Sequence, residues 1–198
     1  MSGFLQTGRW ATLLIAFFVP YAAAQTPANP MPLAQRLQLC AGCHGADGNS
    51  LTAGIPSLAA QPKIYVENTL VLIREGVRSN ALMQGVMKGI SDREIVALAS
   101  HFATLAAKPA PGVLDKALQQ KGRALADKLR CGSCHLPNYH GREQMPRLAG
   151  QREEVLYARM IAFRDKAPPG TDTIMSATLY QITDADIKAM AHFLAHGG

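Results

Sequence analysis

The chain has 198 residues, of which 48% are apolar, 17% are charged and only 6% are aromatic; 20 lysines and arginines outnumber 14 acidic residues. This balance excludes a disordered tail, a collagen-like fibre and a membrane protein with several spans. The length allows one ordinary domain or two small ones. The four cysteines are too few for a disulfide scaffold of this size, so their spacing has to reveal their role.

The first residues of the chain have the layout of a secretory leader. Arg9 precedes an apolar run over 10–19, which is followed by Pro20 and by alanines that end at Ala24. The run is shorter than the ~20 residues that span a bilayer, and a proline closes it, so an uncleaved membrane anchor is the weaker interpretation. We therefore expect a signal peptide over 1–24 and a periplasmic mature chain that is soluble or peripherally associated with the membrane.

The remainder of the chain contains one unit written twice. A C-x-x-C-H motif at 40–44 recurs at 131–135, and a P-x-L-A-x-Q motif at 56–61 recurs at 146–151. The offset between the copies stays almost constant, which places any change of length in loops and leaves the repeated elements intact.

The stretch between the two copies is typical of a stiffened linker, because it contains Pro109 and Pro111. We expect a first domain at 25–106, a linker at 107–113 and a second domain at 114–198. Domains this small have marginal cores of their own.

Apolar residues at helical spacing predict similar helices in both copies. The first two helices of each copy are expected at 33–39, 63–75, 114–130 and 152–165. A third helix in each copy follows a capping signal, at Ser91 in the first and at Thr183 in the second. No segment shows convincing strand alternation. The predicted fold class is therefore all-α.

The spacing of the C-x-x-C-H motif suits covalent attachment of haem. Cysteine, cysteine and histidine at i, i+3 and i+4 share one face of a helical turn. Two neighbouring thiols add to the vinyl groups along one porphyrin edge, and the histidine reaches the iron. The motifs predict two covalently bound haem c groups, with Cys40, Cys43, Cys131 and Cys134 as attachment points and His44 and His135 as axial iron ligands.

Other uses of the cysteines fit the pattern less well. The two C-x-x-C pairs lie in separate repeats, and an all-cysteine zinc site would leave both adjacent histidines without a role. A thioredoxin-like redox pair lacks its βαβ context. A disulfide within C-x-x-C would be strained and would also leave the histidines unexplained.

The sixth iron ligand is expected from the repeat. Met83 and Met175 occupy equivalent places, each seven residues before the isoleucine that opens the capping motif of its copy. Met87 corresponds to a leucine in the second copy and is the nearest competitor to Met83. Elsewhere, His192 and His196 lie near the chain end and are expected to be solvated.

The ordered motifs resemble those of the two-haem cytochromes of the c4 type. In both copies C-x-x-C-H is followed by P-x-L-A-x-Q, a tyrosine, a methionine and a capped helix, and the similarity covers about 33 to 196. The resemblance implies two tandem class I cytochrome c domains, each a small helical fold around one covalent haem. It also implies that the carbonyls of Pro56 and Pro146 accept the second N–H of His44 and His135.

The same resemblance implies further haem surroundings. It places Tyr65 and Tyr157 near the haems, and it makes Arg78 a candidate partner for a haem propionate. The second copy has Gly170 at the position of Arg78. Its equivalent charge is either missing or supplied elsewhere, with Arg164 and Lys166 as candidates.

A haem with both axial positions filled offers no site to a substrate and suits electron transfer. We expect an electron carrier between a quinol-oxidising complex or dehydrogenase and a terminal oxidase, not an enzyme. Two alternatives stay open. One is an electron-transfer subunit of a periplasmic dehydrogenase complex, and the other is a haem peroxidase-like enzyme with an open iron position.

The basic residues are unevenly distributed between the halves. Residues 107–198 carry 13 basic and 9 acidic residues, a net of +4, whereas residues 25–106 carry 6 and 5, a net of +1. This excess indicates either a solvated surface or a docking face for an acidic redox partner. The basic residues are dispersed and form no aromatic-interleaved stripe, so nucleic-acid binding is not expected.

Overall fold

The computed structural model describes residues 31–197, and the signal peptide expected at 1–24 lies outside them. Within this part of the chain every regular element is a helix, and a lone β-bridge joins Arg142 and Met145. The all-α prediction is confirmed. None of the described helices is long and apolar enough to cross a membrane.

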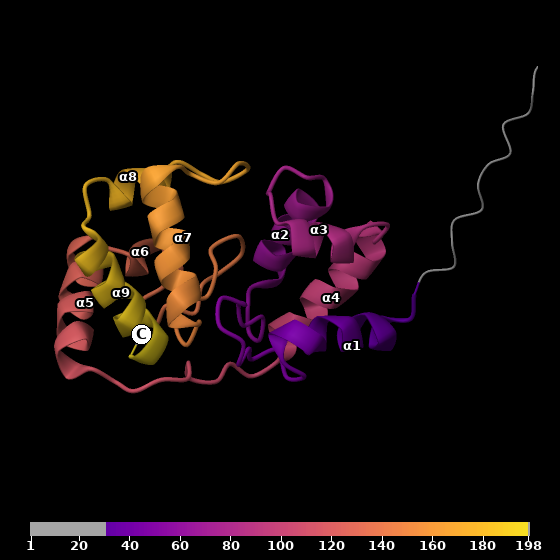
Figure 1. Ribbon diagram of the computed structural model, residues 1–198, viewed down its shortest axis with the longest axis horizontal. Coiled ribbons are helices and arrows are strands. Elements are labelled where there is room, and N and C mark those ends of the chain that lie inside the picture. Colours follow the sequence, from indigo (N-terminus) through magenta and orange to yellow (C-terminus); the bar gives the residue numbers. More distant parts are fainter. Residues whose placement is uncertain (1–30, 198) are drawn as a thin grey trace, which may run out of the picture.

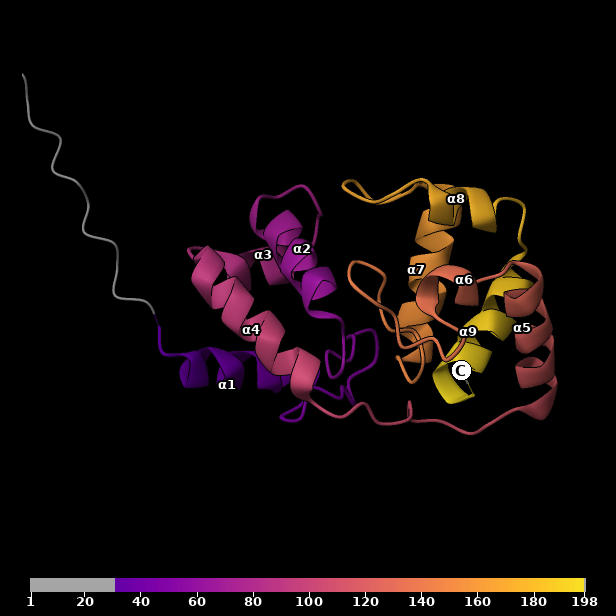
Figure 2. The ribbon, with the colours of Figure 1, turned by 180° about the vertical axis from the view of Figure 1, so that it is seen from behind.

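The described helices form two groups along the chain, joined by a segment that runs along one edge in both views (Figures 1 and 2). The first group contains α1 (Leu33–His44), α2 (Lys63–Arg74), α3 (Ala81–Met87) and α4 (Asp92–Thr104). The second group contains α5 (Lys116–Lys128), α6 (Gly132–His135), α7 (Glu153–Asp165), α8 (Ile174–Leu179) and α9 (Asp184–His196).

The helices α4 and α9 begin where the capping signals predict. The Ser91 hydroxyl accepts a hydrogen bond from the Glu94 N–H, and the Glu94 carboxylate accepts one from the Ser91 N–H, which completes a capping box. The Thr183 hydroxyl accepts from the Asp186 N–H in the same way. These bonds satisfy backbone donors that a helix start would otherwise leave unpaired.

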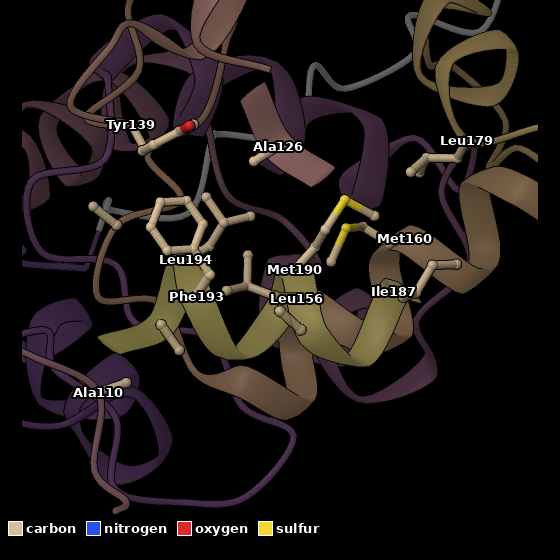
Figure 3. Close-up of a cluster of buried hydrophobic side chains, with 13 residues drawn as sticks. Ala110, Ala126, Tyr139, Leu156, Met160, Leu179, Ile187, Met190, Phe193 and Leu194 are labelled. Carbon is tan, nitrogen blue, oxygen red and sulfur yellow. The ribbon is translucent and has the colours of Figure 1, made fainter. Parts of the chain in front are cut away.

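The second group has the larger core, which α9 builds against α5 and α7 (Figure 3). Gly122 of α5 lies directly against the backbone of α9, since a Cβ at this position would clash with the Ala189 carbonyl oxygen. The Tyr139 ring packs edge-on against Phe193. The core of the first group is a smaller cluster around Met87 and Ile95.

The cysteine motifs sit differently in the two groups. In the first, α1 continues through the motif and ends at His44. In the second, Arg130 adopts a left-handed backbone conformation (φ 57°), which separates α5 from the short helix α6 that carries the motif. The helix expected at 114–130 is thus present as α5 and ends at Lys128, just before this break.

The end of α9 is packed, which corrects the expectation that His192 and His196 are solvated. His192 is buried, and its Nε2 accepts a hydrogen bond from the Asp115 N–H. The proton of His192 is thus on Nδ1, which donates to the Glu153 carboxylate at 2.9 Å. His196 Nε2 lies 3.3 Å from the same carboxylate. These groups form a hydrogen-bonded cluster that joins α7, α9 and the start of α5.

The connecting segment is attached at both ends. At its start the side-chain Nδ2 of Asn49 donates to the Ala106 carbonyl, and the side-chain Oδ1 of Asn49 accepts from the Lys108 N–H. Lys108 also pairs with Asp47. At its end lies the hydrogen bond from Asp115 to His192.

Candidate functional site

In the part of the chain that the structure describes, no disulfide joins the cysteines of the two C-x-x-C-H motifs. Cys43 is exposed, and Cys40, Cys131 and Cys134 are partly buried. Burial raises the pKa of the Cys40 and Cys131 thiols, since desolvation disfavours the thiolate. Two cysteines three residues apart, the second directly before a buried histidine, fit the donor set that attaches a porphyrin.

The two histidines of the motifs are prepared as metal ligands. His44 Nδ1 donates to the Pro56 carbonyl at 2.8 Å, and His135 Nδ1 donates to the Pro146 carbonyl at 2.9 Å. A carbonyl only accepts, so Nδ1 carries the proton and Nε2 of the neutral ring keeps its lone pair. Burial lowers the pKa of both histidines, which favours this neutral form. Both hydrogen bonds are those that the resemblance implied.

The loops that carry these prolines are held by matching backbone bonds. The Gly48 carbonyl accepts from the N–H groups that follow Ser57, and the Tyr139 carbonyl accepts from the equivalent groups that follow Arg147. Gly48 and Tyr139 both have left-handed backbone conformations, with φ of 74° and 55°. The second copy therefore keeps the backbone of the glycine position and adds an aromatic side chain to the core.

The two expected methionine ligands lie on short helices. Met83 is in the first turn of α3, where its N–H donates to the Asn80 side-chain oxygen, and Met175 is at the start of α8. Both side chains are partly buried beside the cores. Met87 is only 2% exposed and packs against the isoleucines around α4, so it acts as a core residue. Of the two candidate ligands in the first copy, Met83 is therefore more accessible than Met87.

Among residues 31–197, three arginines have buried nitrogens without a hydrogen-bond partner: Arg78 Nε, Arg147 Nη2 and Arg152 Nε. Arg147 is the most buried, and its guanidinium hydrogen-bonds only to the carbonyls of Ala59 and Ala149. Burial lowers the pKa of Arg147 to about 10. Arg152 pairs with the Glu154 carboxylate, whereas Arg78 and Arg147 have no carboxylate partner. A buried guanidinium without a carboxylate is costly, so Arg78 and Arg147 fit a cofactor with an anionic edge, as the propionates of a haem provide.

Arg78 is half-buried and close to the other half of the chain. Burial lowers its pKa, and Arg159 of the second group acts in the same direction, while Tyr65 opposes both. The Arg78 guanidinium also donates to the Thr69 hydroxyl at 3.3 Å. An anion near Arg78 and Arg159 would relieve the repulsion between them.

The two residues expected to replace the charge of Arg78 in the second copy, Arg164 and Lys166, are not buried without a carboxylate partner as Arg78 is. Arg164 donates to the Asp184 carboxylate and to the Ile182 carbonyl, just as Arg74 binds Asp92 and Ile90 in the first copy. Arg164 therefore links the end of α7 to the start of α9, and Lys166 is exposed.

Gly170 itself lies at the boundary between the two groups. A Cβ at this position would lie 2.8 Å from Leu72 Cδ2, and the backbone is left-handed (φ 73°). The left-handed backbone favours glycine here, and the position lies against Leu72 and Val77 of the first group.

The buried arginines at the boundary were missed by sequence reasoning. Arg147 and Arg152 lie inside and directly after the repeated P-x-L-A-x-Q motif. A charged residue inside a repeated motif, next to the proline whose carbonyl was expected to bind His135, was the available signal. The sequence did not show that both residues would face the other copy.

Comparisons with known proteins agree with this geometry. A family model described as Cytochrome c matches residues 119–197. The chain is 34% identical to the "Thiosulfate dehydrogenase electron acceptor" of Thiomonas intermedia, over 79% of this chain and 77% of that protein. It is 30% identical to "Cytochrome c4" of Azotobacter vinelandii, over 79% of this chain and 83% of that protein. The crystal structure of reduced recombinant cytochrome c4 from Pseudomonas stutzeri superimposes with a TM-score of 0.75 at 27% identity, covering 82% of this chain and 95% of that one.

Proposed function

Since the chain belongs to the two-haem cytochromes of the c4 type, we propose that it carries single electrons in the periplasm, from a quinol-oxidising complex or a dehydrogenase to a terminal oxidase. It is a carrier with two covalently bound haem c groups, and it is not an enzyme. The leader-like residues 1–24 support the location. The proposed domains are 25–106 and 114–198, with 107–113 as the linker.

The proposed ligand sets follow the two copies. The first haem is attached to Cys40 and Cys43, and the second to Cys131 and Cys134. The proposed axial pairs are His44 with Met83 and His135 with Met175. Partly buried tyrosines support haem surroundings that contain Tyr65 and Tyr157.

When bound, each haem supplies an iron that accepts or gives one electron. The chain's own residues make this exchange easy by keeping the coordination constant. The hydrogen bonds to Pro56 and Pro146 fix the orientation and tautomer of the imidazoles. A soft methionine thioether favours the ferrous state and raises the potential. With both axial positions filled by the chain, a substrate finds no open position.

The observation that carries this proposal is the paired histidine geometry. In both copies a buried imidazole donates a hydrogen bond from Nδ1 to a proline carbonyl, which leaves the lone pair of Nε2 for iron. A peroxidase-like enzyme needs an iron with an open or displaceable position. The two equivalent methionines support closed sites instead.

A redox titration of the holoprotein, followed by absorbance, tests the carrier function. We expect two one-electron steps, low-spin spectra in both oxidation states and no rapid binding of carbon monoxide. We also expect the reduced protein to be reoxidised by a purified terminal oxidase. A high-spin haem that binds carbon monoxide rapidly would refute the proposal.

A second candidate is an electron acceptor dedicated to one dehydrogenase. It is favoured by the similarity to the protein from Thiomonas intermedia that is named as an electron acceptor of thiosulfate dehydrogenase. Purified thiosulfate dehydrogenase and a purified quinol-oxidising complex, each mixed with the oxidised holoprotein, distinguish the two candidates. Reduction by the dehydrogenase alone, with a stable complex on size-exclusion chromatography, would favour the dedicated acceptor.

A further inference from the structure

The last residue of the P-x-L-A-x-Q motif has no role in the haem sites described above. It is Gln61 in the first copy and Gln151 in the second, and both are buried, with exposures of 3% and 5%. Buried glutamine is uncommon and has to be hydrogen-bonded. Both side-chain amides bind backbone groups of the other copy, and Gln151 Oε1 also accepts from the Arg152 N–H of its own copy.

The two glutamines make the same pair of bonds in opposite directions. Gln61 Nε2 donates to the Arg147 carbonyl, and Gln61 Oε1 accepts from the Arg147 N–H, both at 3.0 Å. Gln151 Nε2 donates to the Ser57 carbonyl at 2.9 Å, and Gln151 Oε1 accepts from the Ser57 N–H at 2.7 Å. Ser57 and Arg147 are themselves equivalent residues. The four bonds therefore form a reciprocal glutamine clamp between the copies.

A glutamine amide suits this task because it carries a donor and an acceptor side by side, as a peptide unit does. The backbone groups of Ser57 and Arg147 are buried and lie outside any helix. Without the clamp they would be unpaired, at a cost comparable to a lost buried hydrogen bond. Alanine has no polar side-chain atom, and asparagine is one methylene shorter.

The clamp acts next to the iron-ligand histidines. Ser57 follows Pro56, whose carbonyl orients His44, and Arg147 follows Pro146, whose carbonyl orients His135. Each glutamine thus binds the backbone of a residue in the other copy. That residue directly follows the proline whose carbonyl orients the histidine of that copy. The bonds therefore join the two ligand loops directly beside the prolines that hold the ligand histidines.

We propose that Gln61 and Gln151 are positioning residues that fix the two ligand loops, and therefore the two haems, relative to each other. The inference rests on the proposed roles of His44 and His135 as iron ligands. The step that the clamp serves is internal transfer of one electron, in which the ferrous haem of one domain is oxidised and the ferric haem of the other is reduced. Fixed placement keeps the reacting groups in one geometry instead of a range.

Removal of the clamp leaves other bonds across the boundary. The Tyr65 N–H donates to the Glu143 carbonyl at 2.9 Å, and Arg147 Nε donates to the Ala59 carbonyl at 3.0 Å. The glutamine variants should therefore fold and keep both haems, with the two domains held less precisely.

The test uses the full holoprotein with Gln61→Ala, Gln151→Ala and the double variant. Hydrogen exchange should increase at Arg147 in Gln61→Ala and at Ser57 in Gln151→Ala, each in the domain that was not changed. Internal electron transfer, measured after rapid reduction of one haem, should slow several-fold in the double variant. Gln38→Ala on α1 and Gln120→Ala on α5 remove exposed glutamines and are matched controls.

A purely structural role for the glutamines predicts a different result. The variants would then unfold at lower temperature while the internal transfer rate and both potentials stay at the wild-type values. That result would overturn the proposal. Failure of the carrier function is distinguishable, because it would already show in the wild-type redox titration. Gln61→Asn and Gln151→Asn should behave like the alanine variants if reach across the boundary is what matters.

Discussion

Single side chains decide the chemistry of each haem site. One hydrogen bond places the proton of each ligand histidine on Nδ1, and burial keeps the ring neutral. The methionines contribute through accessibility, since Met83 is partly buried at the edge of its core while Met87 fills the interior. Changing one such residue should alter one haem and leave the other as it was.

Replacing a proposed methionine ligand should lower one potential. In Met83→Ala or Met175→Ala we expect the haem to stay attached and its midpoint potential to fall by on the order of 0.1 V, because axial ligands span about 0.8 V in haem proteins. Spectroelectrochemical titration measures both haems separately. Met87→Ala is the control: it should cost roughly 2–5 kcal/mol of stability but keep the potential. A lowered potential in Met87→Ala alone would show that Met87 is the ligand.

The buried guanidinium of Arg147 should raise the potential of a nearby haem. Its positive charge has only carbonyl partners, so it favours the ferrous form, which carries one positive charge less. In Arg147→Leu we expect a potential lower by on the order of tens of millivolts. Arg164→Leu removes an arginine that pairs with Asp184, and it should lower stability without this shift. Equal shifts in the two variants would contradict a specific role for Arg147.

At the scale of elements, the close crossing of α5 and α9 depends on a glycine. Gly122→Ala should destabilise the holoprotein by roughly 1–3 kcal/mol, since the added methyl must displace the α9 backbone at Ala189. Thermal or chemical unfolding measures this loss. Ala124→Ser, on the exposed side of the same helix, should change stability by no more than about 0.5 kcal/mol.

The cap of α4 should make stability depend on pH. The Ser91 N–H lowers the pKa of the Glu94 carboxyl below its ordinary 4.5, and Arg36 acts in the same direction. The folded state therefore favours the charged carboxylate, and this contribution is complete above pH 4.5 and is lost as the pH falls through the folded value. Glu94→Gln should lower stability by roughly 0.5 kcal/mol at neutral pH. In unfolding curves the difference should shrink below pH 4.5.

Long helices that begin at a capping residue, and motifs within a few neighbouring residues, could be predicted from the sequence. Contacts between the two copies could not. The starts of α4 and α9 follow capping residues, and the histidine ligands follow from spacing within five residues. The helices α3 and α8 are too short to show a periodic pattern, although their methionines were identified by repetition. Burial of His192 depends on Asp115 and Glu153, which are distant in sequence. The glutamine clamp depends on pairs separated by 86 and 94 residues.

At the scale of the whole molecule the two halves are similar in plan and unequal in detail. The second half has the larger core and a net charge of +4 before its haem propionates are counted, against +1 for the first. Unequal halves suit a carrier that receives an electron in one domain and delivers it from the other. The basic half is the candidate docking face for an acidic partner.

The rate of reaction with an acidic partner should therefore depend on salt. We expect the association rate of the holoprotein with a negatively charged redox partner to fall steadily as ionic strength rises, because screening shortens the range of attraction to about 10 Å at 0.1 M. Stopped-flow reduction at several salt concentrations measures this. A rate independent of salt would indicate that the basic residues form only a solvated surface.

Because the connecting segment is anchored at both ends, the contacts between the two domains need only a low affinity for each other. Asn49 and Lys108 hold its start, and the bond from Asp115 to His192 holds its end. A tether this short gives each domain an effective concentration of its neighbour on the order of millimolar. Contacts too weak to hold two separate chains together are then sufficient to keep the two domains associated. The four bonds of the clamp need only fix the orientation of one domain relative to the other. Cleaving the segment while both anchors remain would turn the pairing of the haems into a bimolecular equilibrium.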